Sequence, residues 1–215
     1  MKKLLILLLI SVQTFSQVKN ISNATSKDKN NYYLPKKGYI ISYNNILGHA
    51  NWVGWTLKKT DIGVEKYPGV FYTDISLGAN FKRVNRSFYS NTHYDRGHLC
   101  NSQARTSTVL LNKETYVMTN AVPQTPNLNR GIWKKYEDLC QLWALNNENL
   151  TIYAGGLGKI GTLSQQNVNI PEFYWKVIFG HGTQPLCLLF KNDDKTVTAK
   201  IVELSYIQSK TGYQF

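Results

Sequence analysis

The chain has 215 residues, and its 25 Lys and Arg outweigh its 13 Asp and Glu to give a formal net charge of +12. This length suits one domain, at roughly 150 residues per domain as a soft prior. A hydrophobic content of 42% excludes a chain too polar to form a core. A strongly basic chain attracts polyanions, which here means nucleic acid, anionic membranes or acidic polysaccharides. Charge alone does not choose among these partners.

The first 16 residues are typical of a secretory signal peptide. Two lysines are followed by an apolar run from Leu4 to Ile10 and by small or polar residues up to Ser16. Because this run is shorter than the roughly 20 residues that cross a bilayer, we expect cleavage near Ser16 and no membrane span. The segment predicts a secreted or periplasmic protein. The chain that remains loses two positive charges and stays strongly basic.

The next part of the chain contains a polar stretch and then strands. Residues 17–34 are rich in Asn, Ser and Lys, which favours a flexible lead-in, and we expect a single folded domain over residues 35–215. The runs at 38–45 and 51–60 are rich in β-branched and aromatic residues and therefore predict strands. The irregular sequence that follows contains one further expected strand, at 70–72.

The C-terminal half combines helical patterns with strands. Residues 102–119 carry a helical pattern, and apolar residues recur every three or four positions from Ile132 to Trp143, which predicts an amphipathic helix. Three strand-length runs follow, and residues 202–215 predict a short closing helix. The runs are LTIYAGG at 150–156, EFYWKVIFG at 172–180 and QPLCLLFKN at 184–192. Because strands outnumber β–helix–β alternations, the predicted class is α+β, with a central, largely antiparallel sheet and flanking helices.

The sequence does not assign a role to its three cysteines. In an oxidising compartment one pair among Cys100, Cys140 and Cys187 would form a disulfide, but the spacing does not say which pair. At least one of them is expected as a small buried hydrophobe. The chain has no C-x-x-C or H-x-x-x-H spacing, which argues against a zinc site.

The stretch HYDRGHLCN at 93–101 concentrates groups that suit phosphate chemistry. His98 is the side chain best able to accept a proton near neutral pH, and Arg96 offers a planar cation for phosphate oxygens. Gly97 permits a close backbone path, and Asp95 could orient a neighbour. No G-x-S-x-G setting for a nucleophile is visible, so a phosphodiester fits better than an ester or a peptide.

The predicted helix that follows supplies candidate metal ligands. Magnesium binds oxygen ligands and keeps several waters, so one or two protein oxygens suffice. Asn129 offers an amide oxygen, and Glu137 lies eight residues later, about two helical turns along the same side. Arg130 and Gln141 flank this pair. We therefore expect Asn129 and Glu137 to face one site.

Four ordered segments resemble the successive motifs of the DNA/RNA non-specific endonuclease family, the Serratia-type ββα-metal nucleases. They are DRGHL at 95–99, TNAVPQ at 119–124, NRGIWKKYE at 129–137 and IYAGG at 152–156. The likeness continues through NWVGWTL, PEFYWKV and TGYQF, and so covers most of the chain after the signal segment. It implies a ββα-metal nuclease fold and a secreted enzyme that hydrolyses phosphodiester bonds in DNA and RNA. It also implies Mg²⁺, with Mn²⁺ or another divalent cation as alternatives.

The resemblance assigns roles residue by residue. His98 matches the general base that activates water, and Arg96 matches an arginine near the substrate phosphates. Asn129 matches the direct metal ligand, and Glu137 matches the glutamate that contacts the metal through water. Asn120 matches an asparagine that supports either the histidine or the phosphate.

Arg130 and Gln141 are expected to contact substrate beside this group. The other histidines, His49, His93 and His181, are expected to be non-catalytic.

Two departures from the family pattern leave an alternative open. The family usually has Ala-Pro where this chain has Cys100 and Asn101, and many members have an arginine where this chain has Gln141. The alternative is a basic protein of the same fold that binds nucleic acid or another polyanion without cleaving it. In isolation His98 could be a structural histidine, Asn129 a helix N-cap and Glu137 an exposed helix carboxylate. Preference between DNA and RNA, oligomeric state and physiological role stay open.

Overall fold

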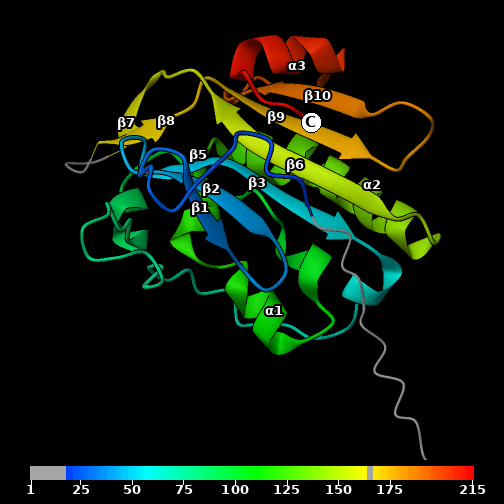
Figure 1. The fold of residues 1–215 in the computed structure, drawn as a ribbon, viewed down its shortest axis with the longest axis horizontal. Coiled ribbons are helices and arrows are strands. Elements are labelled where there is room, and N and C mark those ends of the chain that lie inside the picture. Colours follow the sequence, from blue (N-terminus) through cyan, green and yellow to red (C-terminus); the bar gives the residue numbers. More distant parts are fainter. Residues whose placement is uncertain (1–17, 164–166) are drawn as a thin grey trace, which may run out of the picture.

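The computed structural model describes residues 18–163 and 167–215, so the predicted signal segment at 1–16 lies outside it. Its centre is a seven-stranded sheet in the order β1-β2-β3-β6-β9-β10-β11, in which every neighbouring pair is antiparallel (Figure 1). The strands are β1 (Tyr32–Pro35), β2 (Ile40–Asn44), β3 (His49–Leu57), β6 (Leu150–Leu157), β9 (Phe173–Phe179), β10 (Leu186–Lys191) and β11 (Lys200–Val202). This confirms the predicted α+β class with its largely antiparallel sheet.

Smaller elements surround the sheet. Two short ribbons pair β4 (Asp95–His98) with β5 (Ala121–Gln124), and β7 (Gly161–Leu163) with β8 (Val168–Ile170). The α-helices are α1 (Val109–Glu114), α2 (Lys134–Leu145) and α3 (Leu204–Thr211), and a π-helical segment, η5 (Leu128–Trp133), leads into α2. Short 3₁₀ turns are η1 (Lys59–Asp61), η2 (Arg86–Tyr89), η3 (Ser102–Arg105) and η4 (Met118–Asn120).

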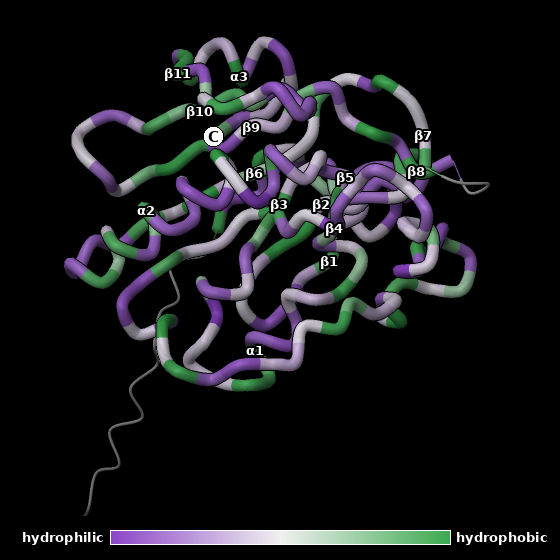
Figure 2. Tube along the Cα trace, turned by 180° about the vertical axis from the view of Figure 1, so that it is seen from behind, coloured by the Kyte–Doolittle hydropathy of each residue, from purple (hydrophilic) through white to green (hydrophobic). Residues whose placement is uncertain are grey.

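The sheet buries apolar side chains on both faces because successive residues of a strand point to opposite sides. Ile178 joins the core cluster that includes residues of α2, whereas its neighbour Val177 packs with Ile207 of α3. The two helices therefore cover opposite faces of the sheet (Figure 1). Figure 2 shows hydrophobic and hydrophilic residues alternating along α2, as an amphipathic helix requires.

The segment expected as a flexible lead-in is instead packed against the domain. Ile21 is 1% exposed, Trp52 donates its indole N–H to Ser22 Oγ at 2.8 Å, and residues 32–35 form the edge strand β1. The expectation for residues 18–34 is therefore corrected. This segment has too few apolar residues to form a periodic pattern, so the burial of Ile21 could not be predicted from the sequence.

Most of the predicted strands and the closing helix are present in the structure, but two other predicted elements differ. The five strands expected in the two halves appear as β2, β3, β6, β9 and β10, and the closing helix appears as α3. The strand expected at 70–72 is only an isolated bridge between Tyr72 and Val117, and the helical pattern at 102–119 becomes three short pieces, η3, α1 and η4. No helix among the described residues combines the length and the apolar character that crossing a bilayer requires.

Candidate active site

The DRGH motif forms strand β4, which pairs antiparallel with β5. His98 lies opposite Ala121, and Gly97 lies opposite Val122. A Cβ atom at Gly97 would collide with the buried side chain of Gln124. The glycine is therefore required by packing against β5, which corrects the expectation that it lets the backbone approach a ligand.

His98 packs against two aromatic rings. Its ring centroid lies 4.7 Å from that of Phe71 and 4.8 Å from that of Tyr116, the latter edge-on. Its Nε2 atom is buried and has no hydrogen-bond partner among the described residues. Burial lowers the pKa of His98 from its usual 6.5 to about 4, because a charged imidazolium would lose its hydration. The ring is therefore neutral near pH 7 and able to accept a proton.

Asp95, at the other end of β4, orients the start of the following helical segment. It accepts a hydrogen bond from Asn129 Nδ2 at 3.0 Å, and Arg130 binds both carboxylate oxygens at 2.8 and 2.7 Å. Burial raises the pKa of Asp95, but the bonds from Arg130 and Asn129 outweigh it, so the pKa lies below its usual value. Asp95 is thus an ionised carboxylate that holds the Asn129 amide in one orientation.

The side-chain oxygen of Asn129 is consequently available. Its amide nitrogen is committed to Asp95, and within the described part of the chain nothing donates a hydrogen bond to its Oδ1. The N-cap position of η5 is taken by Asn127, so Asn129 is not the cap. An amide oxygen fixed by a carboxylate behind it is a suitable ligand for a hard cation.

A break in the helix separates Asn129 from Glu137. Gly131 has φ −102° and ψ −107°, which is non-helical, so two helical pieces meet at a kink there. Eight residues therefore do not make two turns of one continuous helix here, and helical spacing does not place Asn129 and Glu137 on one side.

Glu137 lies near Trp133 and the buried Lys176. Burial raises the pKa of Glu137 to about 7, opposed by the charge of Lys176 and by the nearby Trp133 side chain. Lys176 is 1% exposed, and its Nζ lies 4.1 Å from the centroid of the Trp133 ring. Glu137 is half-buried and not the exposed helix carboxylate that it could be in isolation, and the neighbouring Lys134 binds Asp138 at 2.6 Å.

Asn120 is fully buried and holds the main chain that follows His98. Its Oδ1 accepts a hydrogen bond from the Cys100 N–H at 2.9 Å, and its Nδ2 donates to the oxygens of Cys100 and Thr115 at 2.8 Å each. The amide is thereby fully engaged within the protein. Of the two roles left open by the sequence, its geometry fits support of the histidine segment and leaves no group for a phosphate.

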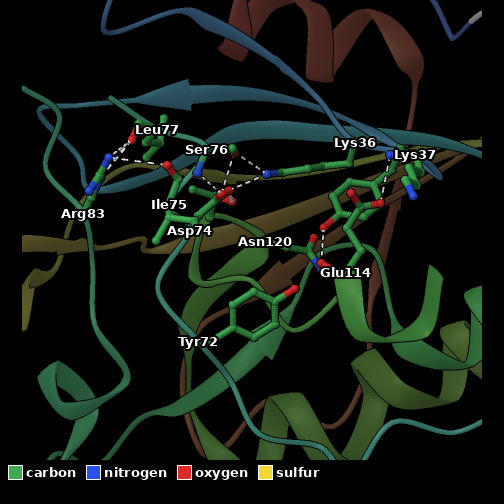
Figure 3. A network of polar contacts seen from close by, with 12 residues as sticks. Lys36, Lys37, Tyr72, Asp74, Ile75, Ser76, Leu77, Arg83, Glu114 and Asn120 are labelled. Carbon is green, nitrogen blue, oxygen red and sulfur yellow. Dashed lines mark hydrogen bonds and ion pairs between the residues drawn. The ribbon is translucent and has the colours of Figure 1, made fainter. Parts of the chain in front are cut away.

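A buried ion pair fixes the turn that carries Asn120. Asp74 accepts from Lys36 Nζ at 2.6 Å and from the hydroxyls of Thr119 and Ser76, as Figure 3 shows for its bonds to Lys36 and Ser76. Burial raises the pKa of Asp74, but Lys36 and these hydroxyls outweigh it and leave the pKa below its usual value. Sequence reasoning missed this network, since its members lie far apart in the chain.

The expected substrate-binding residues differ in their availability. Arg96 is exposed, and its guanidinium lies 5.7 Å from the centroid of the Phe71 ring. Arg130 is 71% exposed but is occupied by Asp95. Gln141 lies half-buried on α2, and no described contact links it to the other predicted site residues. The described contacts thus link Asn120 to the main chain after His98, Asn129 to Asp95 on the same strand, and the start of α2 to the His98 carbonyl, and none of them includes Gln141.

The three cysteines and two of the other histidines, His49 and His181, are packed within the protein. All three cysteines are free and buried, and burial raises the pKa of Cys100 to about 12, so its thiol is unreactive near neutral pH. His49 is buried, and His181 stacks on Trp143 with centroids 3.7 Å apart.

No cluster of three or more His, Cys, Asp or Glu side chains suited to a metal occurs among residues 18–163 and 167–215. A cation here would rely on the Asn129 oxygen and on few carboxylates.

The arrangement of two paired strands followed by a kinked helix matches a known fold. The crystal structure of an EndoG/EndoGI complex, concerned with the inhibition of EndoG, superposes with a TM-score of 0.72. The match covers 85% of this chain and 84% of that chain at 21% identity. The chain therefore has the ββα-metal nuclease fold, with β4, β5 and the η5–α2 helix carrying the candidate site.

Sequence comparison identifies the family. The family model described as DNA/RNA non-specific endonuclease matches residues 16–215. A nuclease of Nostoc sp. (strain PCC 7120) is 35% identical over 206 residues, covering 89% of this chain and 75% of the relative. A nuclease of Serratia marcescens is 24% identical over 79% of this chain and 66% of its own length. The chain belongs to the DNA/RNA non-specific endonuclease family, whose members are hydrolases.

Proposed function

We propose that the protein is an exported, divalent-metal-dependent endonuclease that hydrolyses phosphodiester bonds in both DNA and RNA. A single arrangement carries the proposal. An uncharged His98 lies at one end of β4, and Asp95 at the other end of the same strand orients an Asn129 whose amide oxygen is free. A histidine base and a cation ligand in one site are what hydrolysis of a phosphodiester requires.

His98 acts as the general base. The neutral imidazole accepts the proton of the attacking water, and the protein disfavours the charged form in the absence of substrate, which makes the proton acceptor available at neutral pH. Arg96 is an exposed cation two residues before His98 on the same strand, and it binds the non-bridging oxygens of the phosphate. Asn120 holds the main chain behind the base.

The donor set fits a hard divalent cation. Asn129 Oδ1 would bind it directly, and Glu137 would support it through water, which agrees with a preference for oxygen ligands. Mg²⁺ is the cation we propose, with Mn²⁺ as the alternative. When bound, such an ion polarises the phosphate and stabilises the leaving oxygen.

Two departures from the family pattern kept a non-cleaving binding protein open. Cys100 is 0% exposed and Asn101 7% exposed, so both are buried within the domain, whereas Gln141 is half-buried on α2. Membership of a nuclease family favours hydrolysis over binding alone. Export is proposed from the segment 1–16, which is typical of a signal peptide and lies outside the described residues.

A cleavage assay tests the proposal. Purified protein is incubated with supercoiled plasmid and with a structured RNA, each with Mg²⁺, with Mn²⁺ and with EDTA. We expect nicking and RNA fragmentation with metal and neither with EDTA. The His98→Ala variant should lose cleavage by about 10²–10⁴-fold while it still binds DNA in EDTA. Cleavage by that variant at the wild-type rate would contradict the assigned base.

A further inference from the structure

An aromatic strip extends outward from His98. We define it as Phe71, Tyr116, Tyr67 and Tyr72. Tyr116 lies 4.8 Å from His98, 5.2 Å from Phe71 and 5.3 Å from Tyr67, measured between ring centroids. All four rings are partly exposed. The candidate base is therefore at the inner end of a row of ring contacts that runs through Phe71 and Tyr116 to Tyr67, and Tyr72 lies beside Tyr67 at Lys113.

A cation lies at each end of the strip. The Arg96 guanidinium sits 5.7 Å from the Phe71 centroid, and Lys113 Nζ sits 5.7 and 5.8 Å from the centroids of Tyr67 and Tyr72. Lys113 is exposed, and no carboxylate of the described chain lies within ion-pair distance of it. The nearby Glu114 accepts the Lys37 N–H at 2.8 Å. The outer cation is free to bind an anion.

The loop that presents Tyr67 is fixed before any ligand arrives. Its backbone is bonded to the α1 region: Tyr67 N–H donates to Asn112 Oδ1 at 2.8 Å, and Glu65 N–H donates to the Thr106 oxygen at 3.1 Å. The same loop exposes apolar side chains, with Val64 87% and Val70 44% exposed. Rings held in place by a fixed backbone bind with little loss of conformational entropy.

We propose that Tyr67 and Lys113 form a subsite for the nucleotide next to the cleaved phosphodiester, Tyr67 stacking on its base and Lys113 binding its phosphate. The inference rests on the proposed nuclease function. Stacking suits an enzyme without sequence preference, because every base has a π-face and no base edge is read. When the nucleotide binds, its base replaces the Lys113 ammonium group over the Tyr67 ring, and its phosphate binds that ammonium group.

The experiment separates the base from the backbone. Wild type, Tyr67→Leu, Tyr67→Trp and Lys113→Met are assayed on an oligothymidylate and on an oligomer of equal length built from abasic tetrahydrofuran units. We expect Tyr67→Leu to raise KM about tenfold on the oligothymidylate, consistent with the loss of one base–aromatic stack. It should leave KM on the abasic oligomer unchanged, and Tyr67→Trp should restore the wild-type value.

Lys113→Met should raise KM on both oligomers and reduce the slope of log KM against log salt by about one, as loss of one phosphate contact requires. Tyr206 and Lys210 on α3 provide a matched control, because Lys210 Nζ also lies 5.7 Å from a tyrosine ring centroid there. Tyr206→Leu and Lys210→Met should change neither KM. Equal effects of Tyr67→Leu on both oligomers, or none on either, would overturn the subsite.

Binding of the same oligomers in EDTA, followed by fluorescence anisotropy, repeats the comparison without cleavage. If the wild type cleaves neither oligomer, the proposed function fails, while the ratio of affinities between the two oligomers still decides the subsite. Because Tyr67 is tied to α1 through its backbone, its side chain can be replaced without removing that bond. Circular dichroism of each variant verifies the fold.

Discussion

Trp133 donates its indole N–H to the main-chain oxygen of His98 at 3.2 Å, and so joins the kinked helix to the end of strand β4. The same side chain lies near enough to Glu137 to oppose the rise in the pKa of that carboxyl, and its ring lies against the ammonium group of Lys176. Trp133 is 0% exposed. One buried side chain therefore links the candidate base to the helix that carries the carboxylate expected to support the metal.

Trp133→Phe keeps an aromatic ring but removes the indole donor. A neutral hydrogen bond contributes about 0.5–1.5 kcal/mol, and 1.4 kcal/mol is a factor of ten, so we expect kcat to fall by about one order of magnitude. KM for DNA should stay near the wild-type value, because the exposed binding residues are untouched. Steady-state kinetics measure both. Trp143→Phe, which alters a tryptophan stacked on His181, is the control and should leave kcat unchanged.

The ring of Phe71 helps to keep water from His98, which predicts a shift in pH dependence. Burial lowers the pKa of His98 to about 4, so the base stays neutral as the pH falls from 7 towards that value. In Phe71→Ala, water reaches the ring and the pKa should rise towards 6.5. The acid limb of the kcat profile should then move to higher pH, with a larger loss at pH 6 than at pH 8.

The control for that profile is Phe215→Ala, which removes a ring from the aromatic group on the other face of the sheet. Its acid limb should coincide with that of the wild type. A Phe71→Ala profile that is lowered equally at every pH would mean that the ring positions His98 without excluding water from it.

Asp95→Ala removes the carboxylate that orients Asn129. Loss of a group that orients a metal ligand typically costs 10–100-fold in metal affinity or activity. We expect the Mg²⁺ concentration for half-maximal cleavage to rise by about that factor. Titration of activity against Mg²⁺ measures it. Asp138→Ala, which removes the exposed partner of Lys134, is the matched control. An unchanged Mg²⁺ requirement in Asp95→Ala would remove the basis for assigning Asn129 as a ligand.

The sequence pointed to the candidate site residues but not to the local structure that holds them. The ordered motifs single out His98, Asn129 and Glu137 as candidates, because those residue types at those places suit the proposed chemistry. Their geometry was not predictable from periodicity, since Gly131 breaks the helix between the last two. DRGH is too short and too polar to read as a strand, and it becomes one only because β5 pairs with it.

Residues that support the site were hidden for a different reason. Lys176 sits inside the apolar run EFYWKVIFG, and a buried lysine becomes apparent only when the Trp133 ring and the Glu137 charge are seen beside it. Phe71 and Tyr116 lie in segments without clear periodicity, and their contact with His98 is made by tertiary packing. Long-range contacts of this kind leave no local pattern in a single sequence.

The Lys36–Asp74 ion pair predicts a large loss of stability when one partner is removed. The two side chains are 6% and 4% exposed, and Asp74 also accepts from Thr119 and Ser76. Removing one member of a buried pair typically costs about 3–5 kcal/mol, because the other charge remains buried without compensation. Asp74→Ala should therefore lower the free energy of unfolding by about that amount, measured by urea denaturation. Asp138→Ala, at an exposed pair, should cost under about 0.5 kcal/mol.

The lowered pKa of Asp74 predicts how this stabilisation depends on pH. The pKa of Asp74 in the folded protein lies below its usual 3.8, so its contribution is complete above that value and is lost as the pH falls through the folded-state pKa. Compared with Asp74→Asn, the wild type should be more stable by a constant amount at pH 5 to 7. The difference should shrink towards zero in more acidic solution. A difference that persists unchanged below pH 3 would show that shape, and not charge, makes Asp74 stabilising.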